Sequence, residues 1–315
     1  MQPFVRIYDL RKGEFCTLPD AGFVLALGNF DGVHAAHQSL LLRAVRVARQ
    51  KRLYSAAWCF DPPSSTVLQP SLKQLCTQKE KLSLLSACGL DFVFLADFTT
   101  LRHLSPSEFI RDVLQRHARA VHVVCGFHFH FGKGGVGDAS MLQSFFGHDC
   151  VDIIPPVCVS MHGQPTVISA SGVRAALSLG NVQDAARILG RPYALTAPVA
   201  HGKALGRTLG FPTVNQNVPA EKMMPKQGIY ATRVRIGHEI YFGVTNVGIR
   251  PTVDTGEPTI NCETHILDFD CDLYAQTVTV EFMHRLRDEQ RFDSLDALRS
   301  AISQDVKKAK AYFKK

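Results

Sequence analysis

The chain has 315 residues, of which 46% are hydrophobic and 20% charged, the balance of a globular protein with room for two domains. No apolar run reaches the ~18 residues of a membrane-spanning helix, and the first residues lack a signal-peptide layout, so we expect a cytoplasmic protein without membrane contact. The net charge of +7 is divided as 17 basic against 14 acidic residues up to Asp184 and 18 against 14 beyond it. This even spread disfavours a nucleic-acid-binding face and suits anionic small molecules. Nine scattered cysteines without a C-x-x-C pair disfavour disulfides and zinc.

The first half alternates strand-like and helix-like segments. Apolar runs predict buried strands at residues 22–28, 53–60, 92–96 and 120–125. A helix is predicted from near His37 to about Gln50, and capping boxes that begin at Thr77 and Ser105 predict two further helix starts. This alternation predicts a doubly wound parallel sheet.

The loop after the first of these strands is a candidate ligand site, because ligands of such sheets bind at the carboxyl ends of the strands. It contains Asn29, His34 and His37, and the two histidines are three residues apart, so they can share one face where the helix begins. Imidazoles in this position can bind and stabilise a leaving pyrophosphate. By itself, however, a pair of histidines is more often structural or simply exposed.

The second half has a different texture. Asn181 caps a short helix that Gly190 ends, and we place the domain boundary there, giving residues 1–184 and 185–315. Beyond it, alternating segments at residues 228–236, 239–247 and 277–283 predict antiparallel strands with one buried face. A final helix over residues 294–313 has an apolar stripe. A small antiparallel barrel closed by a C-terminal helix is the expected arrangement.

Residues 201–215, HGKALGRTLGFPTVN, combine phosphate-binding and metal-binding features. Glycines spaced four apart let backbone amides approach a ligand, and basic side chains between them suit phosphate: Gly202, Lys203, Gly206, Arg207 and Gly210. Thr213 and Asn215 follow as hard oxygen ligands of the kind that Mg²⁺ prefers. The stretch is not a Walker P-loop. On composition alone it would be a glycine-rich loop between strands.

This stretch resembles the phosphate and metal loop of riboflavin kinases, G-x-x-L-G-R-x-x-G-F-P-T-A-N, with Val214 in place of alanine. Residues 27–41, LGNFDGVHAAHQSLL, resemble the G-x-F-D-G-V-H-x-G-H-Q-x-L-L signature of the FMN adenylyltransferase half of bifunctional riboflavin kinase/FAD synthetases. Further phrases extend the resemblance to essentially the whole chain. It implies that residues 185–315 phosphorylate riboflavin to FMN with ATP and Mg²⁺, and that residues 1–184 adenylylate FMN to FAD.

The resemblance also implies roles for individual residues. In the first half it assigns catalysis to His34, His37 and Arg174, and nucleotide binding to Asn29. In the second half the phrase ETHILDF resembles the family's E-x-H-L-L-D-F and makes Glu263 the base that deprotonates riboflavin. The remaining assignments are phosphate binding by Gly202, Lys203, Gly206, Arg207 and Gly210, metal binding by Thr213 and Asn215, a nucleotide contact by Asn246 and a flavin contact by Arg287.

Most departures from the family pattern fall in the first half. They replace a glycine, a His-Pro pair, an Asp, two basic residues and parts of the I-S-S-T-x-I-R motif: Ala36, Pro63, Ser64, His128, His130, Gly135, Ala170, Ser171 and Gly172. We therefore hypothesise that adenylyl transfer is weakened while the fold is kept. His128 and His130 are alternatively a compensating set of donors.

Two alternatives remain open at this stage. One is a riboflavin kinase whose first domain is structural or regulatory. The other is a flavin-responsive binding protein, which would need a concentrated basic or aromatic patch that the even charge distribution disfavours. The expected partners are riboflavin, FMN and ATP, without nucleic acid or membrane, and the expected state is a monomer or weak homo-oligomer.

Overall fold

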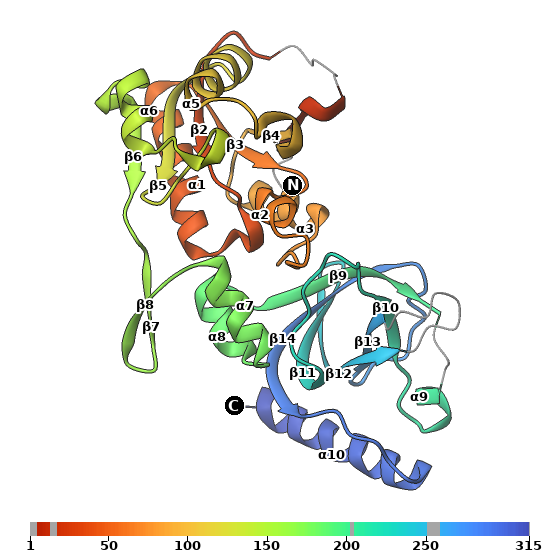
Figure 1. Cartoon of the computed structure of the whole chain (residues 1–315). Coiled ribbons are helices and arrows are strands. Elements are labelled where there is room, and N and C mark those ends of the chain that lie inside the picture. Colours follow the sequence, from red (N-terminus) through yellow and green to blue (C-terminus); the bar gives the residue numbers. More distant parts are fainter. Residues whose placement is uncertain (1–4, 13–17, 202–204, 251–258, 315) are drawn as a thin grey trace. The chain divides into compact units, whose positions relative to one another are not determined.

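The computed structural model describes residues 5–12, 18–201, 205–250 and 259–314. The chain divides into two compact units, Met1–Ala170 and Ser171–Lys315 (Figure 1). The boundary expected from the sequence, between residues 184 and 185, falls inside helix α8 (Val182–Leu189). The division by contacts lies earlier because α8 packs against strands of the second unit.

The first unit is built on a parallel sheet, as the alternating pattern predicts. Within the described residues the strand order is β1-β4-β3-β2-β5-β6, and every neighbouring pair is parallel. The strands are β1 (Arg6–Asp9), β2 (Phe23–Leu27), β3 (Tyr54–Phe60), β4 (Phe92–Ala96), β5 (Ala120–Gly126) and β6 (Val151–Ile154). The edge strands β1 and β6 were not anticipated from the sequence.

Helices connect these strands, and a small hairpin follows them. They are α1 (Ala35–Lys51), α2 (Ser64–Leu68), α3 (Gln78–Ala87), α4 (Phe98–Leu101), α5 (Pro106–Glu108), a π-helix η3 (Phe109–His117) and α6 (Ala139–Phe146), with the hairpin strands β7 (Cys158–Met161) and β8 (Gln164–Val167). Both predicted capping boxes form, at Thr77 with Glu80 and at Ser105 with Glu108. Helix α1 begins two residues earlier than expected.

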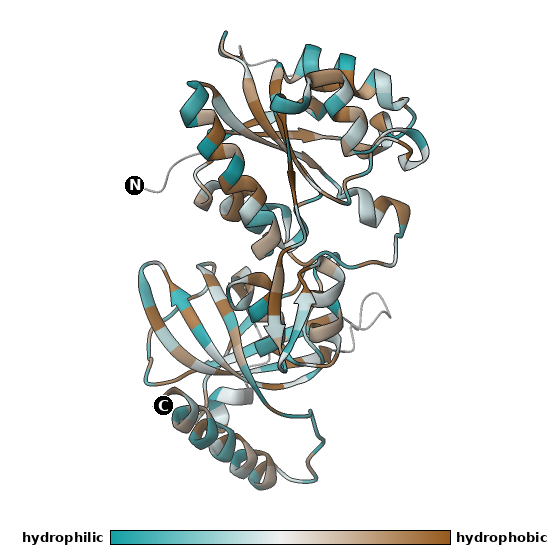
Figure 2. Cartoon of the chain, turned by 90° about the vertical axis from the view of Figure 1, so that its left-hand side faces the viewer, coloured by the Kyte–Doolittle hydropathy of each residue, from teal (hydrophilic) through white to brown (hydrophobic). Residues whose placement is uncertain are grey.

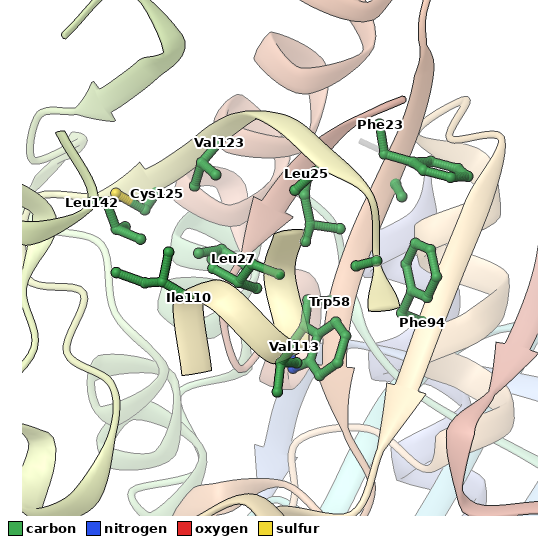
Figure 3. Close-up of a cluster of buried hydrophobic side chains, with 14 of the residues drawn as sticks. Phe23, Leu25, Leu27, Trp58, Phe94, Ile110, Val113, Val123, Cys125 and Leu142 are labelled. Atoms are coloured by element: carbon green, nitrogen blue, oxygen red, sulfur yellow. The ribbon is translucent and has the colours of Figure 1, made fainter. Parts of the chain in front are cut away.

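Two apolar layers cover the sheet. Successive residues of a strand point to opposite faces, so Val24 and Ala26 join the core beneath α1, whereas Phe23, Leu25 and Leu27 join the core beneath η3 and α6. Figure 3 shows the second core, in which Trp58 and Phe94 pack beside Ile110, Val113 and Leu142. Figure 2 shows the strands of this sheet as predominantly hydrophobic.

The second unit is a closed antiparallel barrel with the order β10-β13-β12-β11-β14-β9, as predicted. Its strands are β9 (Tyr193–Ala200), β10 (Val214–Asn217), β11 (Gly228–Ile236), β12 (Glu239–Arg250), β13 (Thr259–Ile266) and β14 (Thr277–Arg287). Its helices are α7 (Ala170–Ser178), α8, α9 (Leu205–Thr208) and α10 (Leu295–Phe313). The apolar stripe of α10 covers β11 and β12. No helix of the described residues is long and apolar enough to cross a membrane.

The inside of the barrel contains a chain of buried hydroxyl groups. Thr245 Oγ1 lies 2.8 Å from Thr232 Oγ1 and 2.9 Å from Thr264 Oγ1, and all three residues are fully buried. Residues that alternate with these threonines therefore lie on the opposite, outer face of the same strands. The candidate catalytic residues of the second unit belong to this outer face.

Candidate functional site

The loop after β2 turns sharply at the carboxyl end of the sheet. Phe30 and Val33 have φ angles of 47° and 40°, in the left-handed region that a β-branched residue such as Val33 rarely adopts. Hydrogen bonds with residues 75 and 76 hold this turn in place. Leu75 N donates to Asp31 Oδ1 at 2.9 Å, and Gly32 N donates to Cys76 Sγ at 3.2 Å. Strain of this kind is kept where a site needs a defined backbone.

The turn delivers His34 and His37 to the start of α1. His34 is the N-cap, and its Nδ1 accepts a hydrogen bond from His37 N at 3.3 Å. The two rings stack with centroids 3.6 Å apart, and the His37 ring meets Phe30 edge-on. Burial lowers the pKa of His37 well below its usual range, and the neighbouring His34 and Lys81 lower it further. The His37 ring is therefore neutral near pH 7, so it can offer a hydrogen bond but no positive charge.

Asn29 joins this loop to helix α2. Its Nδ2 donates to Ser65 Oγ at 2.9 Å, and its Oδ1 accepts from Ser64 N at 3.2 Å. The sequence predicted Asn29 beside the histidines, and the structure places it on the same turn. Arg174 lies on α7 in the second unit, half-buried.

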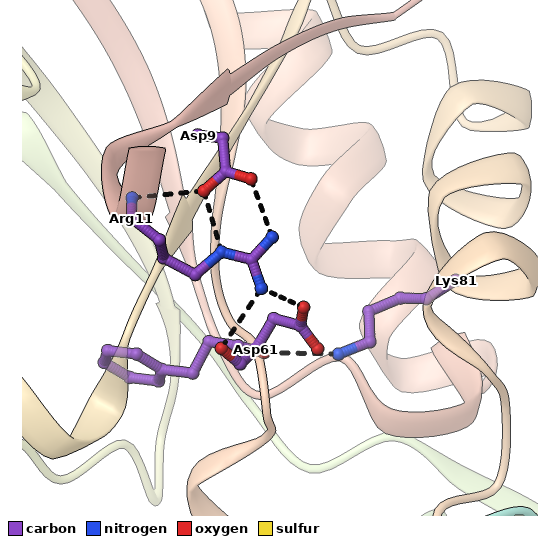
Figure 4. Close-up of polar contacts among 5 residues, drawn as sticks. Asp9, Arg11, Asp61 and Lys81 are labelled. Carbon is purple, nitrogen blue, oxygen red and sulfur yellow. Dashed lines mark hydrogen bonds and ion pairs between the residues drawn. The ribbon is translucent and has the colours of Figure 1, made fainter. Parts of the chain in front are cut away.

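A charged network at the ends of β1 and β3 was missed by sequence reasoning. Arg11 pairs with Asp9 through two side-chain bonds of 2.7 Å and also binds Asp61 (Figure 4). The bond to Asp9, with Asp61 beside it, raises the pKa of Arg11. Lys81 points toward the same place from α3, is only 2% exposed, and donates to Phe60 O at 3.4 Å. Asp61 follows Arg11 by 50 residues and Lys81 comes later still, so no local pattern could have joined them to Asp9 and Arg11.

The departures from the family pattern after β5 lie on the surface. His128 and His130 are exposed, and the His128 ring packs on Phe127 with centroids 3.7 Å apart. Gly135 has a φ of 67°, a conformation that favours glycine over the basic residue of the family pattern. These positions thus differ in shape as well as in charge from what the pattern predicts.

In the second unit, the glycine-rich loop folds back on itself before β10. A Cβ at Gly206 would lie 2.4 Å from Phe211 O and 3.3 Å from Thr213 Oγ1, so only glycine permits this approach. Gly210 has a φ of 84°, and Arg207 is exposed. Gly202 and Lys203 lie outside the described residues.

Three polar residues form a row across the outer face of the barrel. Glu263 on β13 is directly opposite Asn215 on β10 and Asn246 on β12. Asn215 is 6% exposed, and Asn246 Oδ1 is buried without a hydrogen-bond partner among the described residues. Sequence reasoning named all three residues separately, and the strand register now brings them together.

Neighbouring side chains support this row. Asn261 donates to Glu263 Oε1 at 2.6 Å, and His265 Nδ1 lies 2.8 Å from Pro212 O, which ties the glycine-rich loop to β13. Asn261 was missed, although its position two residues before Glu263 on a strand predicts that both point to the same side. Asn246 Nδ2 also donates to Glu289 Oε1 at 3.4 Å.

Arg287 anchors the C-terminal helix. It donates to Asp305 from Nε at 3.0 Å and from Nη2 at 2.7 Å, and Asp305 is 2% exposed. Its Nη1 donates to Asp288 O at 3.0 Å. The guanidinium is thus engaged in holding α10 to β14, and a flavin contact by Arg287 stays a prediction.

The residues around Thr213 and Asn215 fit a magnesium ion that also binds nucleotide phosphates. The Thr213 hydroxyl and the Asn215 amide oxygen are hard oxygen ligands of the kind that suits Mg²⁺. The space that a Cβ at Gly206 would fill borders Thr213 Oγ1. Within the described ranges, no group of three or more His, Cys, Asp or Glu side chains is placed to hold a metal.

Comparisons with known proteins match both units. Residues 18–165 match the model of the FAD synthetase family, and residues 189–313 match the model of the riboflavin kinase family. The chain is 36% identical over 300 residues to a bifunctional riboflavin kinase/FMN adenylyltransferase of Escherichia coli (strain K12) and 32% identical over 301 residues to one of Listeria monocytogenes, and each alignment covers 94% of both chains. A crystal structure from Streptococcus pneumoniae, described as a macrolide-efflux protein, is 29% identical with a TM-score of 0.84, covering 97% of this chain and 99% of that one.

Proposed function

Because the chain belongs to the family of bifunctional riboflavin kinases/FMN adenylyltransferases, it is an enzyme of FAD biosynthesis, and we propose that it converts riboflavin to FAD in two steps. The second unit transfers the terminal phosphoryl group of ATP to riboflavin. The first unit transfers the adenylyl group of a second ATP to the FMN that results. The residue assignments below are part of this proposal.

In the kinase reaction, Glu263 accepts the proton of the riboflavin hydroxyl as its oxygen attacks the γ-phosphorus of ATP, and ADP leaves. The observation that carries this assignment is the register that puts the carboxylate directly opposite Asn215. A carboxylate within hydrogen-bond reach of the hydroxyl is sufficient as a base. A bound Mg²⁺ neutralises charge that develops on the phosphate oxygens. Thr213 and Asn215 would hold it, and the loop with Gly206, Arg207 and Gly210 would hold the phosphates.

In the adenylyl transfer, a phosphate oxygen of FMN attacks the α-phosphorus of ATP, and pyrophosphate leaves. His34 and His37 lie at the N-terminus of the 17-residue helix α1, where backbone N–H groups and the helix dipole favour an anion. Since His37 is neutral near pH 7, it supports pyrophosphate as a hydrogen-bond donor. Asn29 orients the same loop through its bonds to Ser64 and Ser65. The catalytic role of Arg174 stays a prediction from the family resemblance. Because Ala36, His128 and His130 stand where the family pattern has other residues, we still expect adenylyl transfer to be weakened.

The proposal is tested by following flavins in reactions of the purified full chain with ATP and Mg²⁺. Riboflavin as substrate should give FMN and then FAD, and FMN as substrate should give FAD directly. Chelation of Mg²⁺ should stop both reactions. Absence of FMN in the first reaction would contradict the kinase assignment, and FAD formation as fast as FMN formation would contradict the weakened adenylyl transfer.

The alternatives from the sequence receive no support from the comparisons. The match of residues 18–165 to the FAD synthetase family gives no support to a protein that is only a kinase, and the matches to two enzyme families give none to a binding protein. We retain the cytoplasm as the proposed location. The eight cysteines of the described residues are free thiols, as a reducing compartment allows.

A further inference from the structure

We propose that Asn261 is a positioning residue of the kinase reaction, whose amide group holds the Glu263 carboxylate and the Asn215 side chain in the orientation that phosphoryl transfer needs. The inference rests on the proposed riboflavin kinase activity. None of the motifs of the glycine-rich loop or of the ETHILDF phrase includes this residue.

The geometry places one amide group between the two candidate catalytic side chains. Asn261 Nδ2 lies 2.6 Å from Glu263 Oε1 and 3.5 Å from Asn215 Oδ1. Asn261 and Glu263 are two residues apart on β13 and therefore project to the same side. Asn215 faces Glu263 from β10 in the antiparallel register. The three side chains thus form one connected polar group.

The chemistry of the groups fixes which atom of Asn261 faces them. A carboxylate and an amide oxygen only accept hydrogen bonds, so the NH₂ group must point toward both. Its two N–H bonds are enough for one donation to each partner. The bond to Glu263 is short, as charge-assisted bonds are. Asn261 can therefore hydrogen-bond both partners, which a side chain of the same size without two N–H donors cannot do.

The expected benefit is a restricted carboxylate. Glu263 is half-buried, and a glutamate side chain loses substantial rotamer freedom when it is held in one orientation. A base that is displaced by about 1 Å loses rate because the reacting atoms no longer line up. The longer contact to Asn215 orients the amide oxygen that would bind the metal. One residue thereby couples the base to the metal ligand.

A neighbouring residue provides a matched control. Asn217 lies directly opposite Asn261 on β10, is exposed, and its side chain forms no hydrogen bond within the described part of the chain. Replacing it by alanine removes the same amide group from the adjacent strand without touching Glu263. The Asn217→Ala variant should therefore keep the kinetic constants of the wild type.

The test measures riboflavin phosphorylation by the full chain. Asn261→Ala should lower kcat about 10–100-fold, the range found when a residue that orients a metal ligand is removed. The KM for riboflavin should change little, because the amide does not bind the flavin. Calorimetric titration with Mg-ADP should show weaker binding than in the wild type. The formation of FAD from added FMN should be unaffected, because the first unit carries out that step. An unchanged melting temperature of the second unit should show that the barrel is still folded.

Two further variants separate positioning from packing. Asn261→Asp keeps the shape but sets a second carboxylate against Glu263, so kcat should fall at least as far as in Asn261→Ala. In a Glu263→Gln background, which lacks the base, Asn261→Ala should cause little additional loss of kcat, because the two residues act as a unit.

The outcomes distinguish this inference from the proposed function. If the wild type phosphorylates riboflavin and Asn261→Ala retains full kcat and full affinity for Mg-ADP, the positioning role is wrong while the kinase assignment stands. Additive losses in the double variant would also overturn the role. If the wild type forms no FMN, the proposed function and this inference fall together.

Discussion

At the scale of single residues, the two candidate sites use different kinds of polar group. The first unit presents two stacked imidazoles at a strained turn, of which that of His37 is neutral near pH 7, whereas the second presents a carboxylate that the Asn261 amide holds on a sheet surface. The neutral state of His37 follows from its burial, and the orientation of Glu263 follows from strand alternation. Both features are therefore consequences of where the fold puts the side chain.

The burial of His37 predicts a pH-dependent stability of the first unit. Because its folded pKa lies below the unfolded value of 6.5, the unfolded chain binds the proton first as the pH falls. The stability that His37 contributes is complete above pH 6.5 and declines below it, by at most about 1.4 kcal/mol per pH unit.

Urea unfolding monitored by tryptophan fluorescence measures the stability of the first unit, because the single tryptophan, Trp58, is buried there. The free-energy difference between the wild type and His37→Gln should shrink from pH 7.5 to pH 5.5. A difference that stays constant over this range would show that His37 titrates alike in both states.

At the scale of elements, the sequence predicted the helices and strands that have a capping motif or an alternating pattern within their own residues. Both capping boxes formed, and the alternating segments of the second half became β11, β12 and β14. The missed strands β1 and β6 have four residues each and are defined by pairing with β4 and β5. Partners distant in sequence leave no periodicity within so short a segment. The same reason explains why the Asp9–Arg11–Asp61 network was not predicted.

In the turn between α7 and α8, adding one methyl group at Gly180 should strongly lower the stability of the second unit. Gly180 has a φ of 77°, and a Cβ there would lie 2.5 Å from Arg285 Cδ. Gly180→Ala should destabilise the second unit by at least about 2 kcal/mol through backbone strain and overlap. Gly237, with a φ of 59° and nothing within 4 Å, is the control, and Gly237→Ala should cost about 1 kcal/mol. Calorimetric unfolding that gives equal losses for both variants would refute the close packing.

The attachment of α10 predicts a second contrast. Asp305→Ala leaves the Arg287 guanidinium without its buried partner and should cost about 3 kcal/mol. Lys310 on the same helix pairs with Asp268, and both side chains are more exposed. Lys310→Ala should therefore cost less than about 1 kcal/mol. Thermal unfolding of the second unit compares the two variants. A larger loss of stability in Lys310→Ala than in Asp305→Ala would contradict this expectation.

At the scale of the whole molecule, the chain consists of two units with separate cores and separate candidate sites. The family resemblance was sufficient to predict both folds, since its motifs lie in both halves. The boundary expected between residues 184 and 185 differs from the division by contacts, because α7 and α8 contribute to the second unit through tertiary contacts. Leu177 O, for example, accepts a hydrogen bond from Lys226 N at 2.8 Å.

This difference in boundary predicts the behaviour of fragments. A fragment of residues 171–315 keeps α7 and α8, whereas residues 185–315 lose the Asn181 cap and the buried Val182 and Leu177. The longer fragment should be soluble, cooperatively folded and active in riboflavin phosphorylation. The shorter one should unfold at a clearly lower temperature. Equal melting temperatures would favour the boundary at residue 184.

The central claim is that the barrel phosphorylates riboflavin with Glu263 as the base. It is tested most directly by comparing the wild type with Glu263→Ala in parallel reactions that start from riboflavin and from FMN. We predict that the variant loses about 10²–10⁴-fold in FMN formation and converts added FMN to FAD at the rate of the wild type. A variant that forms FMN from riboflavin at the wild-type rate would contradict the account.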